Sequence, residues 1–526
     1  MKLFLLLVIF SFFGEQSLHA QIYKWVDESG RTQFSDKPPP STLDESNEPK
    51  PSSVLTTKTK PVKAYPETSI TLKVRGLLEE KKFKELNTYL AKLQANVDSN
   101  IAAEDDLYTA YYTFRIEDKS YESLFNAWID STPNNYSAYL ARARYYYGLG
   151  WMVRGTSWAS ETKKEKMKEM SDYLNKAMVD ITAVFRITDR SLVSYTTLIN
   201  IANTFGKDKE AEAAVRKALE IQPASYVVRT SYLNTLTPRW GGSYQKMAAF
   251  IKESLRFIKE NPKIKWLGGE IYADTASMSS IRNAPNAAEE QYTKALSFGE
   301  NHIILQKRAK VKFRLKKYKS ALEDFNRAIA VYPEDADYYY WRGKTHVQGK
   351  NNSKAMADIQ YAAKLKPNDE KINKLYEWLL LTEGYSLRNS VNKSSEIDKY
   401  NTALRLNPNN ADTYYRRARA YIAQNKNDLA IKDLDKAIEL DSNNIEHYVL
   451  IDFVLAKSRE WKRIISYWDK FIALTPSSGR AYRERGGAYY RMGDMKSAVE
   501  NAKRSADLGD LAGKEIYEKF RGRVGQ

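Results

Sequence analysis

The chain has 526 residues, of which 43% are hydrophobic, so it is long enough and apolar enough to bury a sizeable core. It has no cysteine, which excludes disulfides, thiolate metal sites and cysteine nucleophiles. Its formal net charge of +18 would attract polyanions, but Lys and Glu are interspersed along the chain, as is also typical of solvated helix faces.

Residues 1–20 have the pattern of a secretory signal peptide. Lys2 precedes an apolar run over residues 3–13, and Ala20 is the predicted cleavage position. The run is shorter than the roughly 20 residues that a membrane-spanning helix needs, so an uncleaved anchor is the weaker alternative. No later segment is apolar enough to cross a membrane, and we therefore expect an exported protein that is periplasmic or secreted.

Residues 21–40 predict a small β-hairpin, because apolar and polar residues alternate on both sides of a turn at Gly30. The segment resembles a short module of unknown function that follows the signal peptide of many bacterial envelope proteins, through Tyr23-Lys24-Trp25-Val26-Asp27, Gly30, Phe34-Ser35-Asp36 and Pro38-Pro39. The resemblance implies a location rather than an activity. An isolated hairpin is the alternative.

Residues 41–68 are rich in Pro, Ser, Thr, Lys and Glu and predict a flexible linker. Residues 69–299 then show helical periodicity with irregular spacing. Between about residues 110 and 262 they resemble a second bacterial family of unknown function, through Ala127-Trp128, Trp151, Arg154-Gly155 and Pro238-Arg239-Trp240-Gly241-Gly242-Ser243. This resemblance implies a helical-repeat fold and no activity.

Residues 300–526 repeat with a period of 34. Pro333 and Pro367 lie 34 residues apart, and Gly299 stands 34 residues before Pro333. The same spacing returns after one interval of 41 residues, at Pro408, Ser442, Pro476 and Asp510. Small residues recur at two fixed distances before these positions: Ala287, Ala321, Ala355, Ala430 and Ala498 in one set, and Ala309, Gly343, Ala418 and Gly486 in the other. Such residues allow two helices to pack closely before a helix breaker ends the pair.

This period and these small residues resemble the tetratricopeptide repeat. The resemblance implies an all-α solenoid of helical hairpins, and the family of residues 110–262 is built on degenerate repeats of the same kind. We expect paired helices at 302–315 and 318–331, 336–348 and 353–365, 411–424 and 429–440, 445–458 and 461–474, and 479–492 and 495–508. A stretched unit at 376–406 completes the array, and residues 511–520 form a capping helix.

The first helix of each repeat is expected to line a concave groove. The side chains that this predicts on the groove alternate between aromatic or aliphatic groups and cations: Lys310, Phe313, Tyr340, Lys344, Tyr415, Arg419, Ile422, Phe453, Arg483 and Tyr490. This pattern favours an extended acidic or aromatic peptide as the partner. The alternative is that the rings serve packing alone. Lys344 and Arg419 stand where some relatives have the asparagines of a carboxylate clamp, so that specificity is not expected here.

Arginines recur just before the small residue of the first helix, at Arg142, Arg308, Arg342, Arg417 and Arg485. We interpret them as an internal series of ion pairs with the adjoining helix, stacked on tyrosine. A series of anion-binding groups is the alternative.

No catalytic motif stands out. After the signal, His302, His346 and His447 fall in separate repeats, too far apart to share a metal, and no cofactor pattern is present. Gly241-Gly242-Ser243 precedes a helix, where Ser243 is expected to cap it rather than to bind an anion.

The sequence therefore predicts an exported, non-enzymatic interaction scaffold that binds another protein or peptide, with nucleic acid disfavoured as a partner. The alternative is an envelope-associated protein that binds an anionic polymer or lipid headgroups. A third possibility is an enzyme with its site in the irregular region near Trp240.

Overall fold

The computed structural model describes residues 23–26, 32–35, 69–155, 161–388 and 393–524, so the predicted signal peptide and linker lie outside the described residues. The chain forms two compact units, residues 1–369 and 370–526. Their division falls between Asp369 and Glu370, within the region predicted as one regular array.

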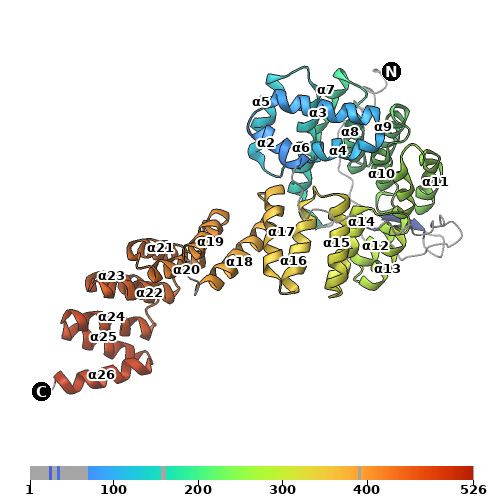
Figure 1. The fold of residues 1–526 in the computed structure, drawn as a ribbon. Helices are drawn as coiled ribbons and strands as arrows, with labels where there is room; N and C mark the ends of the chain where they lie inside the picture. Colours follow the sequence, from blue (N-terminus) through green and yellow to red (C-terminus); the bar gives the residue numbers. More distant parts are fainter. Residues whose placement is uncertain (1–22, 27–31, 36–68, 156–160, 389–392, 525–526) are drawn as a thin grey trace. The chain divides into compact units, whose positions relative to one another are not determined.

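Strands are confined, in the described part of the chain, to one antiparallel pair. β1 (Tyr23–Val26) pairs with β2 (Thr32–Ser35), with Tyr23 opposite Ser35 and Val26 opposite Thr32. All other regular elements of the described chain are helices, and Figure 1 shows them as a series of hairpins. The protein is an all-α array of helical hairpins.

The first unit begins with the irregular region (Figure 1). Its α-helices are α2 (Ile70–Glu79), α3 (Phe83–Ser99), α4 (Glu104–Tyr112), α5 (Glu122–Ser131), α6 (Tyr136–Arg154), α7 (Lys164–Ile187), α8 (Leu192–Thr204), α9 (Asp208–Ile221), α10 (Tyr226–Thr235), α11 (Tyr244–Ser254), α12 (Glu270–Ile281) and α13 (Pro285–Leu296). Short 3-10 helices lie between them: η3 (Ile101–Ala103), η4 (Lys119–Tyr121), η6 (Pro238–Trp240), η7 (Leu255–Phe257) and η8 (Pro262–Gly269).

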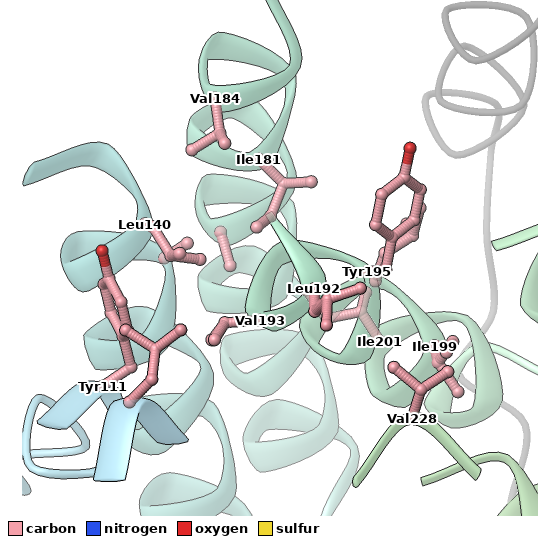
Figure 2. Close-up of a cluster of buried hydrophobic side chains, with 14 of the residues drawn as sticks. Tyr111, Leu140, Ile181, Val184, Leu192, Val193, Tyr195, Ile199, Ile201 and Val228 are labelled. Atoms are coloured by element: carbon pink, nitrogen blue, oxygen red, sulfur yellow. The ribbon is translucent and has the colours of Figure 1, made fainter. Parts of the chain in front are cut away.

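The core of this region lies between its helices. In Figure 2, side chains such as Tyr111 from α4, Leu140 from α6, Ile181 from α7 and Val193 from α8 gather in one cluster. All four are at most 1% exposed. α8 is buried on nearly all sides, so it lies at the centre of this region and the neighbouring helices pack around it.

Four regular repeat helices complete the first unit: α14 (His302–Arg314), α15 (Tyr318–Val331), α16 (Ala336–Gln348) and α17 (Asn352–Leu365). Their bounds agree with the predicted pairs to within one residue. Gly343 explains why a small residue is needed, because a Cβ atom there would lie 3.0 Å from the side chain of Ile359 on α17. The 34-residue period thus reports close packing between the two helices of a hairpin.

The first unit closes on itself through contacts between its beginning and its end. The carboxylate of Glu334, between α15 and α16, accepts hydrogen bonds from Ser69 Oγ at 2.6 Å, Ile70 N at 3.1 Å and Thr71 N at 3.2 Å. It therefore satisfies the free amides at the N-terminus of α2. Tyr332 and Thr109 share a hydrogen bond of 2.9 Å at the same junction. Segments more than 220 residues apart in sequence are held together here.

The second unit continues the hairpins: α18 (Glu370–Leu387), α19 (Lys393–Leu406), α20 (Ala411–Ala423), α21 (Asn427–Leu440), α22 (Ile445–Lys457), α23 (Trp461–Leu474), α24 (Gly479–Met492), α25 (Met495–Asp507) and α26 (Leu511–Val524). α18 begins six residues before the predicted start of its unit at residue 376. The stretched segment lies partly outside the described residues. The predicted capping helix is present as α26, and it extends four residues beyond residue 520.

Turns inside the hairpins share a feature that the sequence analysis did not predict. In six of the described turns, the residue two positions after the last residue of the first helix takes a left-handed conformation although it is not glycine: Lys81, Asn283, Lys316, Lys350, Asn425 and Arg459. A left-handed residue closes the C-terminus of a helix by allowing backbone hydrogen bonds to its last carbonyls. Lys350 N, for example, donates to the carbonyl of Val347 at 3.0 Å.

Candidate functional site

The ten predicted groove residues fall into two groups, one in each unit. Lys310 and Phe313 lie on α14 and Tyr340 and Lys344 on α16, all in the first unit. The other six lie on α20, α22 and α24 of the second unit. We treat the two groups as separate surfaces, called below the α16 surface and the α20 surface.

The α16 surface centres on Trp341, which the sequence analysis did not single out. The Trp341 ring lies edge-on to Phe313 with 5.6 Å between centroids and edge-on to Tyr340 with 5.7 Å. Lys344 Nζ stands 4.7 Å from the centroid of Trp341 and 5.6 Å from that of Phe313. The structure thus brings the predicted residues of α14 and α16 together around one indole ring.

The two lysines of this surface differ in their partners. Lys310 Nζ forms an ion pair with Asp337 Oδ2 at 2.5 Å. Lys344 makes no ion pair with any described residue, and the faces of two aromatic rings surround its ammonium group. Its charge is therefore available to a ligand, and the rings hold it in place by cation–π attraction.

The α20 surface repeats this arrangement at equivalent positions. Tyr415 and Arg419 are four residues apart, as Tyr340 and Lys344 are, and Arg419 lies 5.8 Å from the Tyr415 ring centroid. Within the described chain Arg419 also has no ion pair. The Tyr415 ring contacts His447 of α22 at 5.4 Å, and Ile422 packs against the core of the second unit. Phe453 is 52% exposed beneath Lys457 Nζ, which stands 4.5 Å from its centroid.

Arg483 and Tyr490 are engaged by the end of the chain. Arg483 Nη1 donates to Asp510 at 2.8 Å, and the Tyr490 ring stacks on Phe520 of α26 with 5.2 Å between centroids. Together with Gly486, Arg491 and Lys519 they line a pocket of about 300 Å³ between α24, α25 and α26. The capping helix therefore occupies part of the face that was predicted to bind a partner.

The recurrent arginines form the predicted ion pairs. Arg342 donates from Nε to Asp358 Oδ2 at 2.9 Å and from Nη2 to Asp358 Oδ1, and the same two-point contact joins Arg308 to Asp324 and Arg417 to Asp433. The third nitrogen of Arg342, Nη1, reaches Asn326 on the preceding hairpin at 3.0 Å. Each guanidinium thus joins three helices and is used in packing.

Two members of the arginine series depart from this pattern. Arg142 pairs with Asp180 across the longer α6–α7 hairpin, at a spacing of 38 residues. Arg485 meets Asn501 at 2.9 Å in place of an aspartate and finds its carboxylate in Asp469. All five arginines form internal ion pairs, and the predicted tyrosine contact is present at Arg142, Arg342, Arg417 and Arg485, but the described residues show none at Arg308.

The turn at Gly241-Gly242-Ser243 is explained by packing and capping. Gly241 has φ of 85°, and a Cβ atom on Gly242 would lie 2.0 Å from the carbonyl oxygen of Leu236. Ser243 Oγ accepts from Lys246 N at 3.2 Å and caps α11, as predicted. Arg239 of the same segment is bound to Asp274 of α12. These groups hold the turn between α10 and α11 in its shape.

The three histidines that the structure describes lie in separate environments. His302 stacks on Tyr332 at 4.6 Å, and burial lowers its pKa to about 4. Burial also lowers the pKa of His346 and of His447. Within the described ranges no group of three or more His, Asp or Glu side chains is arranged to hold a metal ion. No helix among them combines the length and apolar character needed to cross a bilayer.

Comparison with known protein families identifies the repeats and two further domains. Residues 307–370 and 411–444 match tetratricopeptide repeat models. Residues 5–67 match a domain of unknown function, DUF4124, and residues 71–210 and 207–258 match another, DUF4034. The chain is a tetratricopeptide-repeat protein. More particularly, it carries an N-terminal DUF4124 domain and a central DUF4034 domain, and both predicted resemblances are confirmed.

Curated relatives are distant. The mitochondrial import receptor subunit TOM70 of Homo sapiens is 23% identical over 355 residues, which is 66% of this chain and 55% of that protein. The Hsp70-Hsp90 organising protein of Plasmodium falciparum is 24% identical over 35% of this chain and 26% of its own length. The chain therefore spans about half of the first relative and about a quarter of the second.

Solved structures include YrrB, a tetratricopeptide-repeat protein with an unusual peptide-binding site. It is 22% identical, covers 37% of this chain and 94% of its own, and has a TM-score of 0.28. A tetratricopeptide repeat protein from Parabacteroides merdae is 18% identical over 62% of this chain and 98% of its own, with a TM-score of 0.24.

Proposed function

We propose that the protein is an exported, non-enzymatic scaffold that binds acidic, aromatic-containing segments of other proteins at two separate surfaces, the α16 surface of the first unit and the α20 surface of the second. The observation that carries this proposal is the repeated pair of a tyrosine and an unpaired cation. Lys344 and Arg419 each follow a tyrosine by four residues, and each lies against an aromatic face without an ion pair among the described residues.

The chemistry of these surfaces suits a peptide with carboxylates and rings. An ion pair formed at a partly buried cation gains more than one in open water, because the aromatic neighbours exclude part of the solvent. The rings supply apolar contact area for a side chain of the partner. Tetratricopeptide arrays bind other chains on such surfaces. The names of the curated relatives, an import receptor subunit and a chaperone-organising protein, support a role in handling other proteins.

Export is supported by the pattern of residues 1–20, in which Lys2 precedes an apolar run and Ala20 is the predicted cleavage position. A periplasmic or secreted location would place the basic scaffold, with its net charge of +18, near anionic envelope surfaces.

A peptide array that varies acidic and aromatic positions tests the proposal on the full chain. We expect Lys344→Glu combined with Arg419→Glu to weaken the best binders at least tenfold, because both reversals place a carboxylate against the peptide's own. The matched control is Lys319→Glu with Lys432→Glu, two exposed lysines on second helices. Equal binding by both double variants would exclude the two surfaces.

The same array distinguishes the alternative of a polyanion binder. Such a protein would bind acidic peptides in proportion to their charge, without preference for aromatic positions, and its affinity would fall steeply with salt. A defined aromatic preference that persists at high salt is the result expected for the groove proposal.

A further inference from the structure

The central domain contains a buried arginine without a partner. Arg144 on α6 is 5% exposed, and its Nε is buried without a hydrogen-bond acceptor. Among the described residues its guanidinium makes no ion pair at all. Arg142, two residues earlier, has the full two-point contact with Asp180 that is typical of this protein. The difference singles out Arg144, because a buried cation without a counter-charge is strongly unfavourable.

A second arginine lies beside it, also without an acidic partner in the described chain. The Arg115 guanidinium is held between the rings of Tyr112 and Tyr147, 5.1 Å from each centroid. Its backbone packs against Gly148, where an added Cβ atom would come within 3.2 Å of Arg115 Cα. Gly148 thus lets the segment after α4 approach the face of α6 that carries Arg144 and Tyr147.

The same face of α6 continues with a further unsatisfied donor. Arg144, Tyr147 and Trp151 follow each other at spacings of three and four residues, so they lie along one side of the helix. Trp151 Nε1 is buried without an acceptor, and its ring contacts that of Tyr147 at 6.4 Å. Two guanidinium groups and one indole N–H are therefore gathered on one strip, with aromatic rings between them.

Neither guanidinium group has an anionic acceptor among the described residues, and the indole N–H has no hydrogen-bond acceptor. Burial and the neighbouring charge of Arg115 lower the pKa of Arg144 to about 10, so it stays charged at neutral pH. A guanidinium presents its donors in a planar fork that matches the oxygens of a carboxylate or a phosphate. An oxyanion between Arg115 and Arg144 would relieve their mutual repulsion and satisfy Arg144 Nε.

We propose that the strip formed by Arg115, Arg144, Tyr147 and Trp151 is a binding site for an oxyanion, the carboxylate or phosphate group of a ligand. The site belongs to the DUF4034 region and is independent of the α16 and α20 surfaces. The aromatic rings on either side suit a ligand whose anionic group is attached to an apolar or planar body.

The test measures the melting temperature of the full chain with inorganic phosphate, with succinate, and with sodium chloride at matched ionic strength. A ligand that binds only the folded state raises this temperature. We expect phosphate or succinate to raise it beyond the effect of chloride. A response to phosphate identifies a phosphate ligand, and a response to succinate identifies a carboxylate. The absence of any response beyond chloride would overturn the proposal.

The decisive variant is Arg144→Met, with Arg190→Met, an exposed arginine of the same unit, as control. Arg144→Met should abolish the anion-dependent shift and should raise the melting temperature of the anion-free protein, because it removes an uncompensated buried charge. A purely structural arginine would show the opposite effect on the anion-free protein. Should Arg144→Met fail to fold, Arg115→Gln provides the second variant, with at least a tenfold loss of anion affinity expected. Retention of the full shift in these variants would refute the site.

Discussion

Arg342 and Asp358, sixteen residues apart on α16 and α17, form a two-point ion pair in which neither side chain is more than 8% exposed. The same spacing of sixteen residues recurs at Arg308–Asp324 and Arg417–Asp433. The pair therefore belongs to the repeat itself. It ties the two helices of a hairpin together at the level of the small residue that allows them to approach.

Asp358→Asn should destabilise the first unit by about 3–5 kcal/mol, because it leaves the buried Arg342 without its counter-charge. The free energy of unfolding in urea measures this loss. Glu439→Gln, which removes one partner of an exposed ion pair, serves as the control and should change stability by less than about 0.5 kcal/mol. A small effect of Asp358→Asn would mean that water reaches the pair.

In the α18–α19 hairpin the charges are exchanged. Glu383 and Lys399 occupy the two positions, 34 residues before Arg417 and Asp433, and their side chains meet at 3.0 Å. We expect Glu383→Lys to lower the melting temperature by bringing two cations together, and Lys399→Glu added to it to restore most of the loss. A double-mutant cycle measures the coupling between the two positions. Additive effects would show that the pair contributes packing only.

The repeat array was predictable from sequence because its 34-residue spacing follows from how the two helices of each hairpin pack against each other. Gly343, Ala309 and Ala418 are small for a steric reason, and the array follows from their period. The closure of the first unit was not predictable, since the bonds of Glu334 to residues 69–71 join segments far apart in the chain without any periodic pattern. Exported location stays a prediction.

Gly343→Leu should cost about 1–3 kcal/mol through overpacking, because even a Cβ atom there meets Ile359 at 3.0 Å. Lys344→Leu, one residue later, should cost less than about 1 kcal/mol, since its ammonium lies on the surface over Trp341 and Phe313. Urea unfolding of both variants checks the difference. Equal losses would contradict the orientation of α16 described above.

The candidate binding residues were only partly predictable. Periodicity places Tyr340 and Lys344 on one face, but Trp341 joins them because its ring reaches across to Phe313 on α14. Adjacent positions on a helix point about 100° apart, so periodicity alone assigns Trp341 to a different face. Tyr490 was predicted on the binding face, but in the structure its ring stacks on Phe520 of the capping helix α26. Periodicity gave no sign of this contact.

Glu334→Gln should loosen the junction that closes the first unit. The amide of glutamine would turn a donor toward the donors of Ser69, Ile70 and Thr71, and a buried amide left without an acceptor costs about 1–3 kcal/mol. Hydrogen exchange should accelerate in α2 and remain unchanged in the helices of the second unit. Glu323→Gln, at an exposed position on α15, is the control. Unchanged protection of α2 would show that other contacts suffice to hold it.

Glu104 makes the stability of the fold depend on pH, and the direction of its pKa shift sets the sign of this dependence. Its carboxyl group is 1% exposed and accepts hydrogen bonds from Ser225 Oγ at 2.6 Å, Tyr226 N at 2.9 Å and Asn261 Nδ2 at 2.9 Å. Burial raises its pKa to about 7 from an ordinary 4.5, against the opposing effect of these hydrogen bonds. Between these two values the folded chain holds a proton that the unfolded chain has released.

The stability that Glu104 contributes is therefore fully present below pH 4.5 and is lost as the pH rises through about 7. Glu104→Gln keeps the size of the side chain and cannot titrate. We expect the stability of the parent, measured by urea unfolding relative to this variant, to fall between pH 4.5 and 7. His302, whose pKa is lowered to about 4, works in the opposite direction, but it is common to both proteins and cancels in the comparison. A difference that stays constant across this range would mean that Glu104 is ionised throughout and that its hydrogen bonds outweigh its burial.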